Sequence, residues 1–241
     1  MRDSISDQMI VAAQDLREKV ERLKFNAPVA HVYNPLDYAW RAHETYLLKY
    51  ADSRKRVVFL GMNPGPFGMV QTGIPFGEVK AVREWMKIEA PIDKPRREHP
   101  KRPIAGFACQ RSEVSGQRLW KMFAERFGRA ESFFAHHCVM NYCPLAFFDK
   151  DGRNLTPDKL PASSAAALFA ACDGHLRRVV QILQPEWVIG IGDFAAKRAE
   201  QTIEGAPPKV GKILHPSPAS PAANRDWAGQ ATEQLGRLGA W

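Results

Sequence analysis

An apolar run that ends in a glycine- and proline-rich loop is the feature that most restricts the fold of this chain. Residues 57–60 read Val-Val-Phe-Leu, and the loop GMNPGPFG follows at residues 61–68. A short apolar run bounded by such turn residues is typical of a buried strand in a parallel sheet. Open α/β sheets bind their ligands at the carboxyl ends of the strands. The side chain of Asn63, the polar residue of this loop, is therefore expected in a functional site.

The rest of the chain alternates between strand-like and helical segments. Strands are expected at residues 57–60, 133–141, 187–192 and 210–214, and helices within 1–50 and at 78–88, 115–127, 163–183, 193–203 and from 222 onward. The helix at 163–183 is expected to have a serine as its N-cap. Strands separated by helices predict a parallel sheet with helices on both faces. We therefore expect an α/β fold, a three-layer α/β/α sandwich with a central, mainly parallel four-stranded sheet.

Three of these strands end in polar side chains that can take part in chemistry. Asn63, Asn141 and His215 follow the first, second and fourth strands, so a parallel sheet brings them to one edge. A Pro-Ser-Pro turn follows His215 and would hold its imidazole rigidly, as stabilisation of a developing anion requires. An ordinary structural histidine is the alternative. The P-loop, GxGxxG, GxSxG and HExxH motifs are missing from the sequence, which disfavours nucleotide-cofactor binding and the corresponding hydrolases.

Size and composition fit one globular domain. The chain has 241 residues, of which 45% are hydrophobic. We expect a single domain over residues 1–241, in which N-terminal helices within 1–50 pack on a catalytic core at 55–241. No apolar stretch approaches the roughly 20 residues of a membrane span. We expect no membrane segment and an intracellular location, cytoplasmic (nucleoid) in a bacterium or nuclear in a eukaryote.

The charge of the chain favours an anionic partner. There are 34 basic and 26 acidic residues, which gives a formal net charge of +8. Basic residues gather at 94–102, a proline-rich stretch that predicts an exposed loop. Phosphate contact through Lys101 and Arg102 and an ordinary solvated loop both remain open for this stretch.

The cysteines show no metal-binding spacing. Cys109, Cys138, Cys143 and Cys172 form no CxxC pair, so buried reduced thiols are expected. A zinc or iron–sulfur site that uses all four is the weaker alternative. We expect neither a metal ion nor a cofactor.

Several motifs together closely resemble the single-strand-selective monofunctional uracil-DNA glycosylases. They are GMNPGPFGM at residues 61–69, QTGIPFGEV at 71–79, EHPKRP at 98–103, SEVSG at 112–116, GRNLTP at 152–157 and HPSP at 215–218. The resemblance covers about residue 57 to the C-terminus and little of the first 50 residues. It implies the uracil-glycosylase superfamily fold and hydrolysis of the N-glycosidic bond of uracil in DNA. It also implies activity on 5-oxidised uracils such as 5-hydroxymethyluracil.

The resemblance assigns a role to each strand-end residue. Phe76 is similar to the aromatic residue on which the flipped-out base stacks. Asn141 matches the asparagine that accepts from N3–H and donates to O4 of uracil, a pattern that cytosine reverses. His215 is implied to donate to uracil O2 as charge develops there, and Asn63 to position the attacking water. No lysine stands at a nucleophile position in these motifs, so strand cleavage is not expected and the product is an intact abasic strand.

The resemblance also implies how the base pocket differs from that of a related family. In the family with the motif GQDPYH, an aspartate stands at the place of Asn63 and a tyrosine at the place of Gly65. The missing carboxylate implies a more dissociative reaction, and the missing tyrosine implies a gap near C5 of the base. Gly65 and Met69 are expected to line that gap, and Met62 to contact the substrate.

A DNA-penetrating wedge is implied after His215. It would consist of Pro216, Ser217, Pro218 and Ala219, and some family members have an arginine at the place of Ala219. A small apolar side chain fills a vacated base stack poorly, so we expect duplex uracil to be processed less readily than single-stranded uracil. The implied partners are single- and double-stranded DNA that contains uracil or oxidised uracil, and a monomer suffices. A non-catalytic nucleic-acid-binding module of the same fold is the main alternative, and an enzyme for free nucleotides a weaker one.

Overall fold

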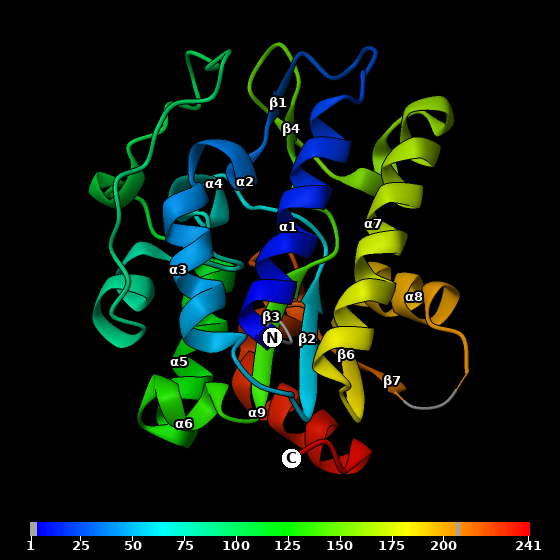
Figure 1. Ribbon diagram of the computed structural model, residues 1–241. Helices are drawn as coiled ribbons and strands as arrows, with labels where there is room; N and C mark the ends of the chain where they lie inside the picture. The colour runs from blue at the N-terminus through cyan, green and yellow to red at the C-terminus, as the bar shows by residue number, and fades with distance from the viewer. Residues whose placement is uncertain (1–3, 206–207) are drawn as a thin grey trace.

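The sheet at the centre of the molecule is parallel. The computed structural model describes residues 4–205 and 208–241 (Figure 1). Its four-stranded sheet has the order β3-β2-β6-β7 and consists of β2 (Val57–Gly61), β3 (His137–Asn141), β6 (Trp187–Ile191) and β7 (Lys209–Ile213). All residues of β2 are buried, which explains the continuous apolar run of this strand. Exposed lysines on β7 suit its position at the edge of the sheet. The predicted parallel sheet is confirmed.

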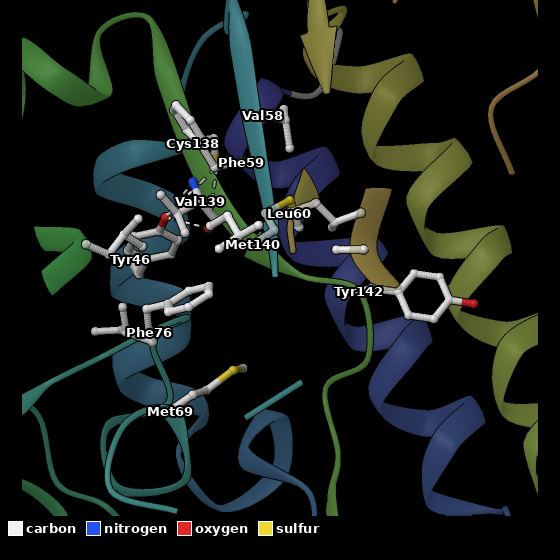
Figure 2. Packing of buried hydrophobic residues seen from close by; sticks show 14 of the residues in the cluster. Tyr46, Val58, Phe59, Leu60, Met69, Phe76, Cys138, Val139, Met140 and Tyr142 are labelled. Atoms are coloured by element: carbon white, nitrogen blue, oxygen red, sulfur yellow. Dashed lines mark hydrogen bonds between the residues drawn. The ribbon is translucent and has the colours of Figure 1, made fainter. Parts of the chain in front are cut away.

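Helices cover both faces of this sheet. One face carries α1 (Ile5–Glu21), α3 (Trp40–Tyr50), α7 (Ala162–Leu183) and α8 (Asp193–Thr202), and the other carries α5 (Val114–Phe127), α6 (Ala130–Phe134) and α9 (Pro221–Leu238). Phe59 of β2 points to the second layer, where its ring centroid lies 5.1 Å from that of Phe123 and 6.2 Å from that of Phe133. Figure 2 shows Phe59 with its neighbours Val58 and Leu60. The predicted three-layer α/β/α architecture is confirmed.

The observed elements differ in detail from several of the predicted ones. Residues 133 and 134 belong to α6, and the strand expected at 133–141 begins only at His137. The helix expected at 78–88 contains the π-helix η1 (Ala81–Trp85). The N-cap of α7 is Pro161 rather than a serine. The helix α9 begins at Pro221, after Ser220, whose hydroxyl accepts a hydrogen bond from the backbone N–H of Ala223.

The shortest helical elements are α2 (Pro35–Tyr38), α4 (Met69–Thr72), η2 (Gly106–Ala108) and η3 (Pro157–Lys159).

A second, antiparallel sheet was not predicted. It has the order β1-β4-β5 and consists of β1 (His31–Tyr33), β4 (Ala146–Phe148) and β5 (Asn154–Leu155). Strands of two or three residues are too short to show a periodic pattern, and β1 lies in a region that was expected to be helical. The sheet joins the N-terminal segment to the chain that follows β3, and it brings residue 154 toward the strand ends.

The remaining predictions concern the N-terminal helices, the cysteines and the membrane. The buried residues of α1 include Met9, Leu16 and Val20, and the helix lies against α7 and α3. The cysteines are free thiols, three of them buried and Cys109 half-buried. In residues 4–205 and 208–241, no three His, Cys, Asp or Glu side chains are grouped to bind a metal ion. Within the same ranges, no helix is long and apolar enough to cross a membrane.

Buried histidines should make the fold sensitive to acid. Burial lowers the pKa of His43, His137 and His175 to about 4, against 6.5 for an exposed imidazole. Between pH 6.5 and 4 the unfolded chain therefore binds more protons at these sites, and each site costs up to about 1.4 kcal/mol of stability per pH unit. The pKa of Glu113 is raised, so below pH 7 the folded chain binds an extra proton there and gains stability as the pH falls. The loss of stability from the three histidines is larger than this gain. Urea unfolding at pH 7, 6 and 5 should show a falling free energy of unfolding, and a constant value would contradict this account.

Candidate active site

A pocket of about 590 Å³ lies at the carboxyl ends of β2, β3 and β7. Among the residues predicted for the site, its lining contains Met62, Asn63, Gly65, Phe76, Asn141, His215, Ser217 and Pro218. Met69, Pro216, Ala219, Lys101 and Arg102 were also predicted for the site and do not line the pocket. The sheet thus brings together side chains that are up to 156 positions apart, as the strand order requires.

Asn63 is held by the chain that follows β3. Its Nδ2 donates a hydrogen bond of 3.2 Å to the backbone carbonyl of Leu145. This bond orients the amide, so the acceptor atom Oδ1 is the one that remains for a ligand or a water molecule. The side chain is a neutral acceptor at the wall of the pocket.

Asn141 ends β3 and is oriented by a thioether. Its Nδ2 donates to Sδ of Met69 at 3.2 Å, so Met69 lies behind the site residue rather than in the pocket wall. Gly61, the β2 residue paired with Asn141, leaves the space that this arrangement needs. A Cβ at position 61 would lie 2.6 Å from Oδ1 of Asn141 and 2.5 Å from the ring of Phe76. Close packing at one glycine therefore positions two walls of the pocket.

Phe76 lies in a strained backbone conformation. Its φ is +52°, in the left-handed region that non-glycine residues rarely adopt. The backbone carbonyl of Phe76 accepts a hydrogen bond of 2.8 Å from Nε1 of Trp120 on α5, and this bond helps to hold the conformation. The ring is 7% exposed, and its centroid lies 6.2 Å from that of His215. Figure 2 shows Phe76 and Met69 beyond the carboxyl end of β2. Strain of this kind is commonly kept where a side chain must be presented to a ligand.

His215 is a neutral hydrogen-bond donor. Its Nδ1 accepts a hydrogen bond of 3.1 Å from the backbone N–H of Ser217, which places the ring proton on Nε2. Burial lowers the pKa of His215, so the imidazole is uncharged at neutral pH. Gly192, at the end of β6, allows the close approach of this side chain, because a Cβ there would lie 3.0 Å from Cβ of His215.

The loop after His215 is anchored at its base and exposed at its tip. Arg118 of α5 donates to the carbonyl of Pro216 at 3.2 Å and to Oδ1 of Asn224 at 2.9 Å. Asn224 in turn donates to the carbonyl of Pro218 at 2.8 Å. Pro216 is buried, whereas Pro218 and Ala219 are exposed. Arg118 was not predicted for the site; no motif distinguishes it in the sequence.

The basic loop lies outside the pocket. Nε of Arg102 donates to the carbonyl of Gly152 at 2.6 Å, and Lys101 is exposed.

A cation in the pocket lining was missed by the sequence analysis. The guanidinium of Arg111 stacks on the ring of Phe67, 3.9 Å from its centroid, and both residues line the pocket.

Glu113 is a further residue that the sequence analysis did not predict for the site. It immediately precedes α5 and lines the pocket, and its Oε2 is buried with no hydrogen-bond partner. Burial and the neighbouring Glu78 raise the pKa of Glu113 to about 7. A Cβ at Gly65 would overlap its carboxyl group, so this group occupies the space expected to be a gap. One feature of the sequence could have indicated this residue. In the SEVSG motif a glutamate directly precedes a helix, at the N-cap position where serine, threonine, aspartate or asparagine is usual.

Comparison with known proteins places these features in a family. Residues 48–235 match the family model described as Uracil DNA glycosylase superfamily. The chain is 45% identical over 238 residues to the single-strand selective monofunctional uracil DNA glycosylase of Mus musculus, with 98% of this chain and 85% of that protein covered. The protein of the same name from Rattus norvegicus is 46% identical, with 98% of this chain and 86% of that protein covered.

A solved structure has the same fold. The crystal structure of wild-type Pedobacter heparinus SMUG2 superposes with a TM-score of 0.67 at 19% identity, and the match covers 95% of this chain and 97% of that one. Because the family model spans most of the chain and the relatives exceed 40% identity over nearly all of it, the assignment rests on both comparisons. The chain belongs to the uracil-DNA glycosylase superfamily and, within it, to the single-strand-selective monofunctional uracil-DNA glycosylases.

Proposed function

We propose that this protein removes uracil from DNA by hydrolysing the N-glycosidic bond. The observation that carries the proposal is the convergence of Asn63, Asn141 and His215 on one pocket with Phe76. The expected product is an intact strand with an abasic site. None of the described residues that line the pocket is a lysine, which agrees with the absence of a Schiff-base intermediate and of strand cleavage.

Recognition of the base would use Phe76 and Asn141. A base inside a duplex cannot reach this pocket, so the nucleotide must be flipped out and stacked on the Phe76 ring. With Nδ2 of Asn141 near Met69, the amide would accept from N3–H through Oδ1 and donate to O4 through Nδ2. Cytosine offers the reverse pattern and would leave buried groups unpaired.

Bond cleavage would depend on a neutral donor. Electrons of the breaking C1′–N1 bond pass to the base, which leaves as an anion, and the Nε2–H of His215 would donate to O2 as negative charge grows there. Oδ1 of Asn63 would orient the water whose oxygen then bonds to C1′, with a water proton released to solvent. Because an amide is not a base, we infer that the sugar cation is well developed before water adds.

The wider substrate range and partners remain part of the proposal. We infer activity on 5-hydroxymethyluracil and related 5-oxidised uracils, on both single- and double-stranded DNA, by a monomer. Lys101 and the exposed tip Pro218–Ala219 are the proposed DNA contacts. Because the side chains at this tip are small and fill a vacated base stack poorly, uracil should be excised faster from single-stranded than from double-stranded DNA. We propose that the enzyme acts inside the cell, on the nucleoid of a bacterium or in the nucleus of a eukaryote.

An excision assay with defined oligonucleotides tests this function. Oligonucleotides that contain uracil, 5-hydroxymethyluracil, thymine or cytosine, each single-stranded and in duplex, are incubated with the protein and treated with alkali. Cleavage after alkali at uracil, and no cleavage without alkali, is the expected result. A non-catalytic binding module would instead give salt-sensitive binding without abasic sites.

Substitution of Met69 by leucine should weaken discrimination against cytosine. Leucine has a similar volume but no acceptor for Nδ2 of Asn141, so the amide loses the contact that opposes its rotation. The uracil excision rate should fall by about twofold to fivefold, the size of one weak hydrogen bond, and the ratio of cytosine to uracil excision should rise. Single-turnover rates on both substrates measure the ratio. An unchanged ratio with a lower uracil rate would show that Met69 only fills space.

A further inference from the structure

Glu113 fills a space created by glycines in the pocket wall. Its carboxyl group lies where side chains at positions 65 and 68 would begin. A Cβ at Gly116 would lie 2.8 Å from Oε2 of Glu113 and closer still to the backbone carbonyl oxygen of Phe76. Two of the glycines belong to the loop that follows β2, and the third belongs to the first turn of α5. Three glycines therefore surround one carboxyl group and leave room for it, and Glu113 forms part of the pocket lining.

The backbone N–H of Gly116 interacts with this carboxyl group, but one of the two carboxyl oxygens lacks a hydrogen-bond partner. Its Oε2 has neither exposed surface nor a partner, whereas the neighbouring Glu78 accepts from Ser112 at 3.0 Å and from the backbone N–H of Ala81 at 2.8 Å. An unpaired buried acceptor is costly, so the missing donor points to a ligand. The terminal torsion of a glutamate is broad and nearly two-fold, so rotation can present either oxygen to the pocket.

The order of groups along the pocket wall would place Glu113 beside C5 of a bound uracil. His215 would meet O2, and Oδ1 of Asn141 would meet N3. The Nδ2 of Asn141, which would meet O4, points toward Met69. Met69 directly follows Gly68, whose missing side chain makes room for Glu113. Because C5 is the ring atom that follows C4 in this direction, its substituent would point toward the Glu113 carboxyl.

We propose that the Glu113 carboxyl accepts a hydrogen bond from the hydroxyl of a 5-hydroxymethyl group, and that Glu113 is thereby a specificity-determining residue. The proposal rests on the proposed function of the pocket. The methyl group of thymine cannot donate and would leave the carboxyl unpaired. Uracil itself has no substituent here and gains nothing from Glu113. The residue would therefore favour 5-hydroxymethyluracil over thymine without opposing uracil.

The electrostatics of the site are compatible with this role. A fully ionised carboxylate would repel the uracil anion as it leaves. Burial and the negative charge of Glu78 hold the pKa of Glu113 near 7, so much of this group is uncharged at neutral pH. The carbonyl oxygen of the protonated form still accepts a hydrogen bond.

Two variants and one surface control test the proposal. Glu113→Gln keeps an acceptor of the same shape, Glu113→Leu removes it, and Glu125→Gln changes an exposed glutamate of α5, the helix that follows Glu113. Each protein is assayed in single-turnover mode on single-stranded oligonucleotides with uracil, 5-hydroxymethyluracil or thymine. In Glu113→Leu, the ratio of the 5-hydroxymethyluracil rate to the uracil rate should fall at least about tenfold, the value of one hydrogen bond to a buried acceptor. Glu113→Gln and Glu125→Gln should keep the wild-type ratio within about threefold.

The outcomes separate this proposal from the function it rests on. An equal loss on both substrates, or an unchanged ratio in Glu113→Leu, would assign Glu113 a purely structural role and overturn the proposal. If Glu113→Leu fails to fold, the wild type decides: it should excise 5-hydroxymethyluracil at least about tenfold faster than thymine. Equal rates, or excision of uracil without any 5-hydroxymethyluracil activity, would also overturn it. A wild type that leaves uracil untouched refutes the proposed function itself.

Discussion

Replacement of His215 by alanine is expected to lower the single-turnover rate of uracil excision by about 10²- to 10³-fold, the usual effect of losing one preorganised oxyanion donor. The physical reason is the state of the ring. Ser217 holds Nδ1 as an acceptor, and burial lowers the pKa, so Nε2 carries a proton at neutral pH without a positive charge. The donor is already oriented when negative charge develops on the base, and alanine leaves that charge without it.

The measurement separates chemistry from folding and binding. Excision is followed with enzyme in excess over a uracil-containing single strand, and affinity for the same strand is measured by anisotropy. His136→Ala is the matched control, because His136 is an exposed histidine just before β3. It should keep the wild-type rate. A His215→Ala protein with the wild-type rate would remove His215 from the mechanism.

The alternation of apolar runs and helical patterns was sufficient to predict the parallel sheet. The strands β2, β3 and β6 are mainly apolar segments of five residues each, and the three polar residues at the strand ends meet in one pocket. Periodicity failed where an element was short, as in β1, or where aromatic residues suit either state. Phe133 and Phe134 belong to α6, although aromatic side chains next to a strand extend a strand pattern equally well.

The site was harder to predict because its walls depend on contacts between distant segments. The role of Gly65 illustrates this limit. A glycine in a loop indicates freedom of backbone or space, but only the fold shows that Glu113, 48 positions later, occupies the space. Met69 is similar: the sequence placed it near the base, and the structure shows its sulfur behind the amide of Asn141. Such side-chain contacts carry no signal in the local pattern.

Gly61→Ala is expected to reduce uracil excision by at least about 10²-fold, the cost of misplacing reacting groups by about 1 Å. The new Cβ would lie 2.5 and 2.8 Å from ring carbons of Phe76 and 2.6 Å from Oδ1 of Asn141. Neither neighbour can yield easily. The Phe76 backbone is already strained at a φ of +52°, and Asn141 is paired with residue 61 in the sheet. Overpacking should also cost about 1–3 kcal/mol of stability, which urea unfolding would measure.

The decisive comparison is between activity and stability in the same variant. Gly174→Ala provides the control, because a Cβ at this position in α7 would meet no heavy atom within 4 Å other than those of its chain neighbours and of the adjacent helix backbone. Alanine there should leave excision unchanged and add about 0.5–1 kcal/mol of stability, the usual gain for a helix interior. Gly61→Ala should instead lose activity far beyond what its unfolded fraction explains. If its activity falls only in proportion to the unfolded fraction, the pocket tolerates the displacement, and the close contact at Gly61 serves packing alone.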